Sequence, residues 1–340
     1  MDYFRPIAQT DPVRPPDAVP LAGGWAWFSH VEHLTRSGSR GLVPAQSLPA
    51  AILRRLSAPR AAIAGLSLDR PRLMGILNVT PDSFSDGGRF DRPEAAVAHA
   101  LALAEAGADL LDIGGESTRP GAADVAVGEE IARTAPVIRA LRARGLTRPI
   151  SIDTRKAPVV HAALQAGARF VNDVAAFSYD PRILDEVAAA RVPLCLMHAQ
   201  GTPATMQADP RYADVLLDVY DFLEARIGQA EAAGIPRSRI VIDPGIGFGK
   251  TVAHNLALLR GLSLFHMTGC AVLLGASRKR FIGALGGGEA ATQTDARGPG
   301  TLAVTLSALQ QGVQIHRLHD IVAAKQALRL WQAMVLGEEA

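Results

Sequence analysis

Cysteine is scarce in this 340-residue sequence, which has only Cys195 and Cys270. Two cysteines do not make a disulfide framework, and they fit a reducing compartment. An excess of one charge is also lacking: 35 basic residues face 33 acidic ones, which gives no basic field for nucleic acid or an anionic membrane. Long uncharged apolar runs and an N-terminal signal core are missing too. We therefore expect a cytoplasmic protein that binds neither nucleic acid nor membrane.

Lysine is the next shortage, because only four of the 35 basic residues are lysines. Where arginine dominates, a lysine that persists indicates a need for a compact point charge. Three of the four lysines, Lys156, Lys250 and Lys279, sit just after predicted strands.

The first 60 residues differ from the rest. Several prolines make the start extended or irregular. Residues 25–31, with two tryptophans, alternate like a strand, and residues 48–56 are typical of a short helix. We expect residues 1–60 to form an N-terminal extension that packs its tryptophans on the main domain, residues 61–340. Residues 61–68 are predicted to form a short strand pair that covers the bottom of a barrel.

From residue 73 onward a strand–helix unit repeats eight times. The predicted strands cover residues 73–78, 109–114, 150–153, 170–173, 192–197, 240–243, 271–276 and 315–318. Between them lie segments with helical spacing, the longest at residues 212–233. Hydrophobic residues make up 48% of the chain, enough for a large core. The pattern predicts an α/β fold, a (β/α)8 TIM barrel. A doubly wound sheet is the alternative, but no GxGxxG turn supports it.

Polar residues stand where these strands end. The amides and carboxylates are Asn78, Asp112, Asp153, Asn172 and Asp243. A single such residue is usually a helix cap, but in a barrel all of them converge on one mouth. Such groups suit a flat heterocycle with alternating donors and acceptors. Four basic residues suit phosphate oxygens, namely Arg119, Lys279, Arg317 and His319.

Two other motifs give weaker evidence of function. The segment GIGFGKT at residues 245–251 looks like a phosphate loop, but Pro244 stands where a Walker A motif needs glycine. Cys195 and His198 lie three apart on a predicted strand and face opposite sides, which makes a poor metal pair.

Eight segments together resemble the dihydropteroate synthase family, from about residue 61 to the C-terminus. They are LMGILNVTPDSFSDGG, DIGGESTRPGA, IDTRKAPV, VNDV, CLMHAQGTPATMQ, DPGIGFGK, GASRKRFIG and RLHD. The resemblance implies a transferase of folate biosynthesis. Members join 6-hydroxymethyl-7,8-dihydropterin diphosphate to 4-aminobenzoate, release pyrophosphate, use Mg²⁺ and are sulfonamide targets. It also implies a homodimer.

The resemblance implies roles for individual residues as well. Asp153, Lys279 and Arg317 would be catalytic, and Asn78 would hold Mg²⁺ on the diphosphate. The pterin pocket would comprise Asp153, Asn172, Met197, Asp243, Lys279 and Arg317. Diphosphate oxygens would meet Arg119, Arg317 and His319. The 4-aminobenzoate pocket would comprise Phe84, Thr118, Pro120, Phe248, Ser277 and Lys279. Loops at residues 80–89 and 116–125 would close over the site.

Two other functions remain open at this stage. A pterin-binding methyltransferase barrel would share the Asp and Asn contacts but would not need the SRK and RLHD segments for a diphosphate. A non-catalytic pterin-binding protein would not need the full set of charged residues at the mouth.

Overall fold

Eight parallel strands close into a barrel in the computed structural model, which describes residues 2–80, 92–117, 122–202 and 205–337. The predicted (β/α)8 barrel is confirmed. Each strand pairs in parallel with the strand before and after it, and the last pairs with the first. The strands are β6 (Arg72–Asn78), β7 (Leu110–Gly114), β8 (Ile150–Asp153), β9 (Phe170–Asp173), β10 (Leu194–Met197), β11 (Ile240–Asp243), β12 (Ala271–Leu274) and β13 (Ile315–Leu318).

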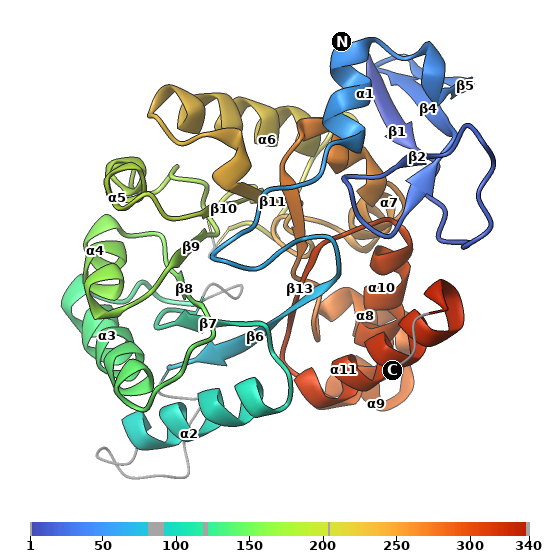
Figure 1. The fold of residues 1–340 in the computed structure, drawn as a ribbon. Helices are drawn as coiled ribbons and strands as arrows, with labels where there is room; N and C mark the ends of the chain where they lie inside the picture. The colour runs from blue at the N-terminus through green and yellow to red at the C-terminus, as the bar shows by residue number, and fades with distance from the viewer. Residues whose placement is uncertain (1, 81–91, 118–121, 203–204, 338–340) are drawn as a thin grey trace.

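Helices surround this barrel (Figure 1). They are α2 (Arg92–Glu105), α3 (Val127–Ala143), α4 (Ala157–Ala166), α5 (Ile183–Ala190), α6 (Val215–Ala232), α7 (Val252–Arg260), α8 (Arg280–Gly286), α9 (Gly288–Thr292), α10 (Gly298–Gln310) and α11 (Ile321–Trp331). Short 3-10 turns follow at η3 (Arg237–Arg239), η4 (Leu262–Thr268) and η5 (Asp295–Arg297), and a π turn covers Gln332–Leu336. Within the described ranges, no helix is both long and apolar enough to cross a bilayer.

The segment after β12 is helical. It forms α8 and α9, with a break at Gly287 (φ +62°). The two helices pack closely because position 283 is glycine: a Cβ there would lie 2.3 Å from the Ala290 carbonyl oxygen. Arg297 then ties the segment together by donating to the carbonyls of Ala290 and Arg278.

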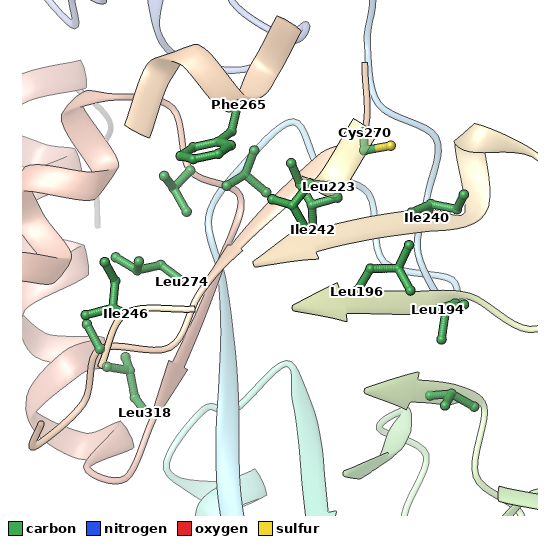
Figure 2. Close-up of a cluster of buried hydrophobic side chains, with 14 of the residues drawn as sticks. Leu194, Leu196, Leu223, Ile240, Ile242, Ile246, Phe265, Cys270, Leu274 and Leu318 are labelled. Atoms are coloured by element: carbon green, nitrogen blue, oxygen red, sulfur yellow. The ribbon is translucent and has the colours of Figure 1, made fainter. Parts of the chain in front are cut away.

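Alternating residues of the strands build two separate cores. Leu194 and Leu196 of β10 and Ile242 of β11 belong to the outer core cluster, which also contains Leu223 of α6 and Phe265 of η4 (Figure 2). The residues between them belong to an interior cluster, whose buried members include Met74, Leu110, Phe170, Cys195, Val241, Leu273 and Ile315. Successive strand residues point to opposite faces. Cys195 is therefore a core residue.

The bottom of the barrel is covered by residues 61–68. Ile63 and Leu68 belong to the interior cluster, and they are almost fully buried. The predicted strand pair is reduced to one antiparallel bridge between Ile63 and Leu66. This plug closes one end of the barrel and leaves the other end for polar side chains.

The extension forms two small sheets beside the barrel (Figure 1). Their strands are β1 (Tyr3–Pro6), β2 (Val19–Pro20), β3 (Trp27–Phe28), β4 (His30–Thr35) and β5 (Gly38–Pro44), with η1 (Ala45–Ser47) and helix α1 (Ala50–Ser57) after them. The strand expected at residues 25–31 is interrupted at Ser29, because β3 pairs with β2 and β4 pairs with β1 and β5. Trp25 is buried, and its indole N–H donates to the Leu309 carbonyl in α10 at 2.8 Å.

We predict that Trp25→Ala destabilises the protein by about 3–5 kcal/mol, because it leaves a cavity and an unpaired carbonyl at the docking surface. Urea denaturation measures this. Val13→Ala is the matched control, since Val13 is 81% exposed and Trp25 is 7% exposed. Equal midpoints for the two variants would show that the extension is not docked through Trp25.

Candidate active site

The inner face of the barrel changes from apolar to charged toward the carboxyl ends of the strands. Two residues after Leu110, Phe170, Val241 and Ile315 of the interior cluster, the same faces carry polar groups. Those groups are Asp112, Asn172, Asp243 and Arg317. Asp153 joins them because it lies beside Asn172 in the β8–β9 register. Tertiary structure thus brings together the polar residues that sequence places at strand ends.

Arg317 links two carboxylates across the mouth. Its Nε donates to Asp112 Oδ2 at 2.6 Å, and one of its terminal nitrogens donates to Asp153 Oδ2 at 2.7 Å. Asn172 donates to the same Asp112 oxygen at 3.0 Å. Asp112 is fully buried, and its Oδ1 has no hydrogen-bond partner among the described residues. That acceptor points to a ligand with a donor group, since an unmet buried acceptor is costly.

The carboxylates at the mouth have shifted acidities. Burial raises the pKa of Asp153 to about 7, with the Arg317 guanidinium opposing the rise and Asp112 adding to it. Burial also raises the pKa of Asp243, against the opposing charge of Lys279. Although burial works against its charge, Asp112 and Asp153 raise the pKa of Arg317, which stays cationic. Shifted groups gathered in one concave region are typical of an active site.

Lys279 lies between β12 and the segment after β11. Its Nζ donates to the Ile246 carbonyl and sits 4.3 Å from the centre of the Phe248 ring. Burial lowers the pKa of Lys279 to about 8, while Asp243 acts in the opposite direction. The residue therefore combines a cation, an aromatic face and a nearby carboxylate at one point of the mouth.

Ser277, His319 and Met197 complete the described part of the mouth. The Ser277 hydroxyl lies 3.0 Å from His319 Nδ1 and accepts from the His319 backbone N–H at 3.3 Å. Met197 is buried at the end of β10 and pairs in register with Asp243. Four predicted site residues, Phe84, Thr118, Arg119 and Pro120, lie outside the described residues, as does most of the loop expected at residues 80–89.

Asn78 is the one described residue expected to hold a metal. It ends β6 and lies beside Gly114 of β7. The described part of the chain contains no group of three or more His, Cys, Asp or Glu side chains that could bind an ion. A single amide oxygen fits Mg²⁺ only where substrate phosphates and waters supply the remaining ligands.

Sequence reasoning missed a buried charge cluster next to the mouth. Lys156 Nζ donates to Glu116 at 2.9 Å, to Glu130 at 2.8 Å and to the Val125 carbonyl at 2.6 Å. Arg155 also donates to Glu116, at 2.9 Å. These bonds join the residues after β7 to those after β8. The scarcity of lysine was the available signal for Lys156, but its partners could not be read from spacing.

Sequence reasoning also missed a buried pair, Lys250 and His198, that contacts the Phe248 segment. Lys250 Nζ is 2.8 Å from His198 Nδ1 and donates to the Phe248 carbonyl at 3.0 Å. Burial and the adjacent Lys250 lower the pKa of His198 to about 2, so the imidazole is neutral. The pair fastens the Phe248 segment to the end of β10.

Known proteins resemble this chain over most of its length. The family described as pterin binding enzyme matches residues 74–319. Dihydropteroate synthase of Neisseria meningitidis serogroup C is 45% identical over 79% of this chain and 94% of its own length. The Escherichia coli K12 protein of the same name is 43% identical over 81% of this chain and 95% of its own.

Solved structures show the same likeness. The Xanthomonas albilineans dihydropteroate synthase with 4-aminobenzoic acid is 51% identical, with a TM-score of 0.75 over 81% of this chain and 98% of that one. Its complex with 7,8-dihydropteroate has a TM-score of 0.73 at 48% identity, over 81% of this chain and 98% of that one. The Yersinia pestis synthase with a sulfonamide drug is 42% identical, with a TM-score of 0.75 over the same shares.

We predict that Arg317→Met destabilises the protein by about 3–5 kcal/mol, because Asp112 would stay buried without its cation. Urea denaturation measures the loss. The double variant Asp112→Asn/Arg317→Met removes the stranded charge and should regain part of it. If both variants unfold at the same urea concentration, the Asp112 charge is not what Arg317 stabilises.

Proposed function

The chain belongs to the dihydropteroate synthase family, and we propose that the barrel mouth around Asp153, Asp243 and Arg317 is its active site. The enzyme is a transferase that condenses 6-hydroxymethyl-7,8-dihydropterin diphosphate with 4-aminobenzoate. The products are 7,8-dihydropteroate and pyrophosphate. The observation that carries the site assignment is the Arg317 bridge between two carboxylates on the inner face of the barrel.

The carboxylates and amide suit the pterin ring. Asp243 would accept from the 2-amino and N3 edge. Asp112 Oδ1, which has no partner among the described residues, offers a second buried acceptor. Asn172 supplies an amide on the same inner face, while Met197 and Arg317 would lie against the ring. A ligand whose donors reach every acceptor would bind tightly, and a ligand that leaves one buried acceptor without a hydrogen bond would bind more weakly.

The 4-aminobenzoate ring would lie on the other side of Lys279. Phe248 offers an aromatic face, Lys279 a cation for the carboxylate, and Ser277 a hydroxyl. The expected partners Phe84, Thr118 and Pro120 belong to the same proposal. The Lys250–His198 pair would hold Phe248 in place for this contact.

The reaction needs charge stabilisation more than a base. When the C–O bond to the pterin methylene breaks, its electron pair leaves with pyrophosphate and the methylene becomes cationic. The Asp153 carboxylate would stabilise that cation, and Arg317, His319 and Arg119 would stabilise the departing oxygens. The neutral amine of 4-aminobenzoate then attacks with its lone pair and afterwards loses a proton. Lys279 would orient that second substrate.

Magnesium enters as part of the substrate complex in this proposal. Asn78 would be its protein ligand, and the bound ion would neutralise diphosphate charge. The expected homodimer and cytoplasmic location, and the division into an extension at residues 1–60 and a catalytic domain at 61–340, are further proposals. The start of the family match at residue 74 supports that division.

We predict that kcat/KM for the pterin diphosphate falls as pH drops below about 7. Burial raises the pKa of Asp153 to about 7, so the carboxylate is progressively protonated and loses the charge that stabilises the cation. Pyrophosphate release, measured with and without 4-aminobenzoate, gives the rate. The same assay separates a synthase from a methyltransferase or a non-catalytic pterin-binding protein.

Asp153→Asn is the matched variant for that profile. It should lose far more turnover than pterin affinity, since only the transition state carries the cation. Its profile should lack the step near pH 7, while substrate ionisation affects both enzymes alike. Turnover within a few fold of the unaltered enzyme would mean that Asp153 has only a structural role at the end of β8.

We predict that Asn78→Ala weakens the Mg²⁺ dependence of pyrophosphate binding, because it removes the proposed amide ligand. Calorimetry with pyrophosphate, with and without Mg²⁺, measures this without turnover. The unaltered protein should bind pyrophosphate more tightly with Mg²⁺, and the variant should lose most of that gain. An unchanged gain would exclude Asn78 as a ligand.

A further inference from the structure

The extension touches the helix that leads away from the active-site mouth. Arg36, in the turn between β4 and β5, donates from its terminal nitrogens to Asp218 and to Asp221 in the first turns of α6. Tyr3 of β1 donates its hydroxyl to Asp221 at 2.9 Å and accepts from Arg36 Nε at 3.2 Å. Two residues of the extension thus meet two carboxylates at the start of α6.

Asp218 also holds the end of the β10–α6 connection. Its Oδ2 accepts from the backbone N–H groups of Ala213 at 2.9 Å and Asp214 at 3.2 Å. Asp214 in turn caps α6 by accepting from the Leu216 N–H at 3.0 Å. One oxygen of Asp218 therefore faces the extension, and the other orients the backbone that enters the helix.

The same connection reaches the segment that carries Phe248. Tyr212 donates its hydroxyl to the Gly249 carbonyl at 2.7 Å, and Gln207 donates to the Gly247 carbonyl at 2.6 Å. Phe248 lies between these two anchored glycines, and its ring faces Lys279. A continuous series of contacts therefore runs from Arg36 to the proposed 4-aminobenzoate pocket.

The backbone around Phe248 is closely packed against its neighbours. Gly249 has φ +62°, and a Cβ there would lie 2.5 Å from the Gln200 carbonyl oxygen of the connection. Gly247 has φ +84°, and a Cβ there would lie 3.0 Å from Lys279 Cδ. Because these backbones pack so closely, a shift of Tyr212 would be passed to Phe248 rather than absorbed.

We propose that the N-terminal extension is a positioning element for 4-aminobenzoate, acting from Arg36 and Tyr3 through Asp218 and Tyr212 on Phe248. The inference rests on the proposed function. A solvent-exposed ion pair alone contributes little, but Asp218 here binds the extension and two backbone N–H groups at once. Relatives that match 94% and 95% of their own lengths cover only 79% and 81% of this chain, so much of the extension lies outside that likeness.

The test is steady-state kinetics of the full chain with Arg36→Ala. We expect KM for 4-aminobenzoate to rise roughly three- to tenfold, the size typical of coupling through a packed network. We expect KM for the pterin diphosphate and kcat to change less than about twofold, because the pterin side is not on the series. Arg36→Lys should give a KM for 4-aminobenzoate between those of the unaltered enzyme and Arg36→Ala, since it keeps one charge contact. Tyr3→Phe, which removes a single hydroxyl, should shift KM in the same direction and by less.

Trp25→Phe is the matched control. It removes the indole hydrogen bond of the extension to α10 but leaves the α6 contact intact. It should lower the melting temperature without changing KM for 4-aminobenzoate. The double variant Arg36→Ala/Tyr212→Phe should raise that KM less than the product of the two single effects, because both changes interrupt one series.

Three outcomes would overturn the inference. An unchanged KM for 4-aminobenzoate in Arg36→Ala would do so, as would an equal rise in Trp25→Phe, which would reduce the extension to a stabilising role. Absence of pyrophosphate release by the unaltered enzyme would overturn both this inference and the proposed function. With release intact, a failure concerns the extension alone.

Discussion

The Arg317 bridge is the interaction on which the mouth depends. A fully buried Asp112 would be very costly alone, and so would Asp153 beside it, because like charges in a low dielectric repel strongly. One guanidinium from β13, which is two strands from β7 and three from β8 around the barrel, reaches both and makes the pair tolerable. Because β13 closes the barrel against β6, the bridge also requires barrel closure. Fold and charge arrangement are therefore interdependent.

Such a bridge prepares the site before substrate arrives. The carboxylates are already held in place, so little reorganisation is needed when a cation develops on the substrate. The charge cluster behind the mouth serves the same end. Lys156 joins Glu116 after β7 to Glu130 of α3, and it stands three residues after Asp153. A displacement of Asp153 would disturb these buried ion pairs, and its position is therefore restrained.

Much of this was predictable from sequence, for physical reasons. The eight strands follow from short apolar runs that end at polar residues, and their ends converge in any closed parallel barrel. Asp153, Asn172, Asp243 and Arg317 were predictable as a group on that basis. The pairing of Arg317 with Asp112 and Asp153 was not, because it depends on which inner faces oppose each other across the barrel. The close packing of α8 on α9 could not be predicted either, because it depends on the missing Cβ of Gly283 rather than on a periodic pattern.

Three lysines lie near the mouth, and residue type alone does not predict their different roles. Their scarcity marked Lys156, Lys250 and Lys279 as positions that need a point charge, yet their surroundings separate them. Although burial works against charge, Glu130 and Glu116 raise the pKa of Lys156, so it is a fixed cation of the framework. Burial and the nearby Lys279 lower the pKa of Lys250, whose contacts are with His198 and a backbone carbonyl.

Lys279 lies between these extremes. Burial lowers its pKa to about 8 and Asp243 limits the fall, so the amine is mostly charged at neutral pH but only partly compensated. A cation with residual demand for an anion, set against an aromatic ring, is suited to an aromatic carboxylate. The same residue type thus serves as framework, as a support for a loop, and as a proposed substrate contact. Partner carboxylates, which the fold selects and the sequence spacing does not reveal, decide among these roles.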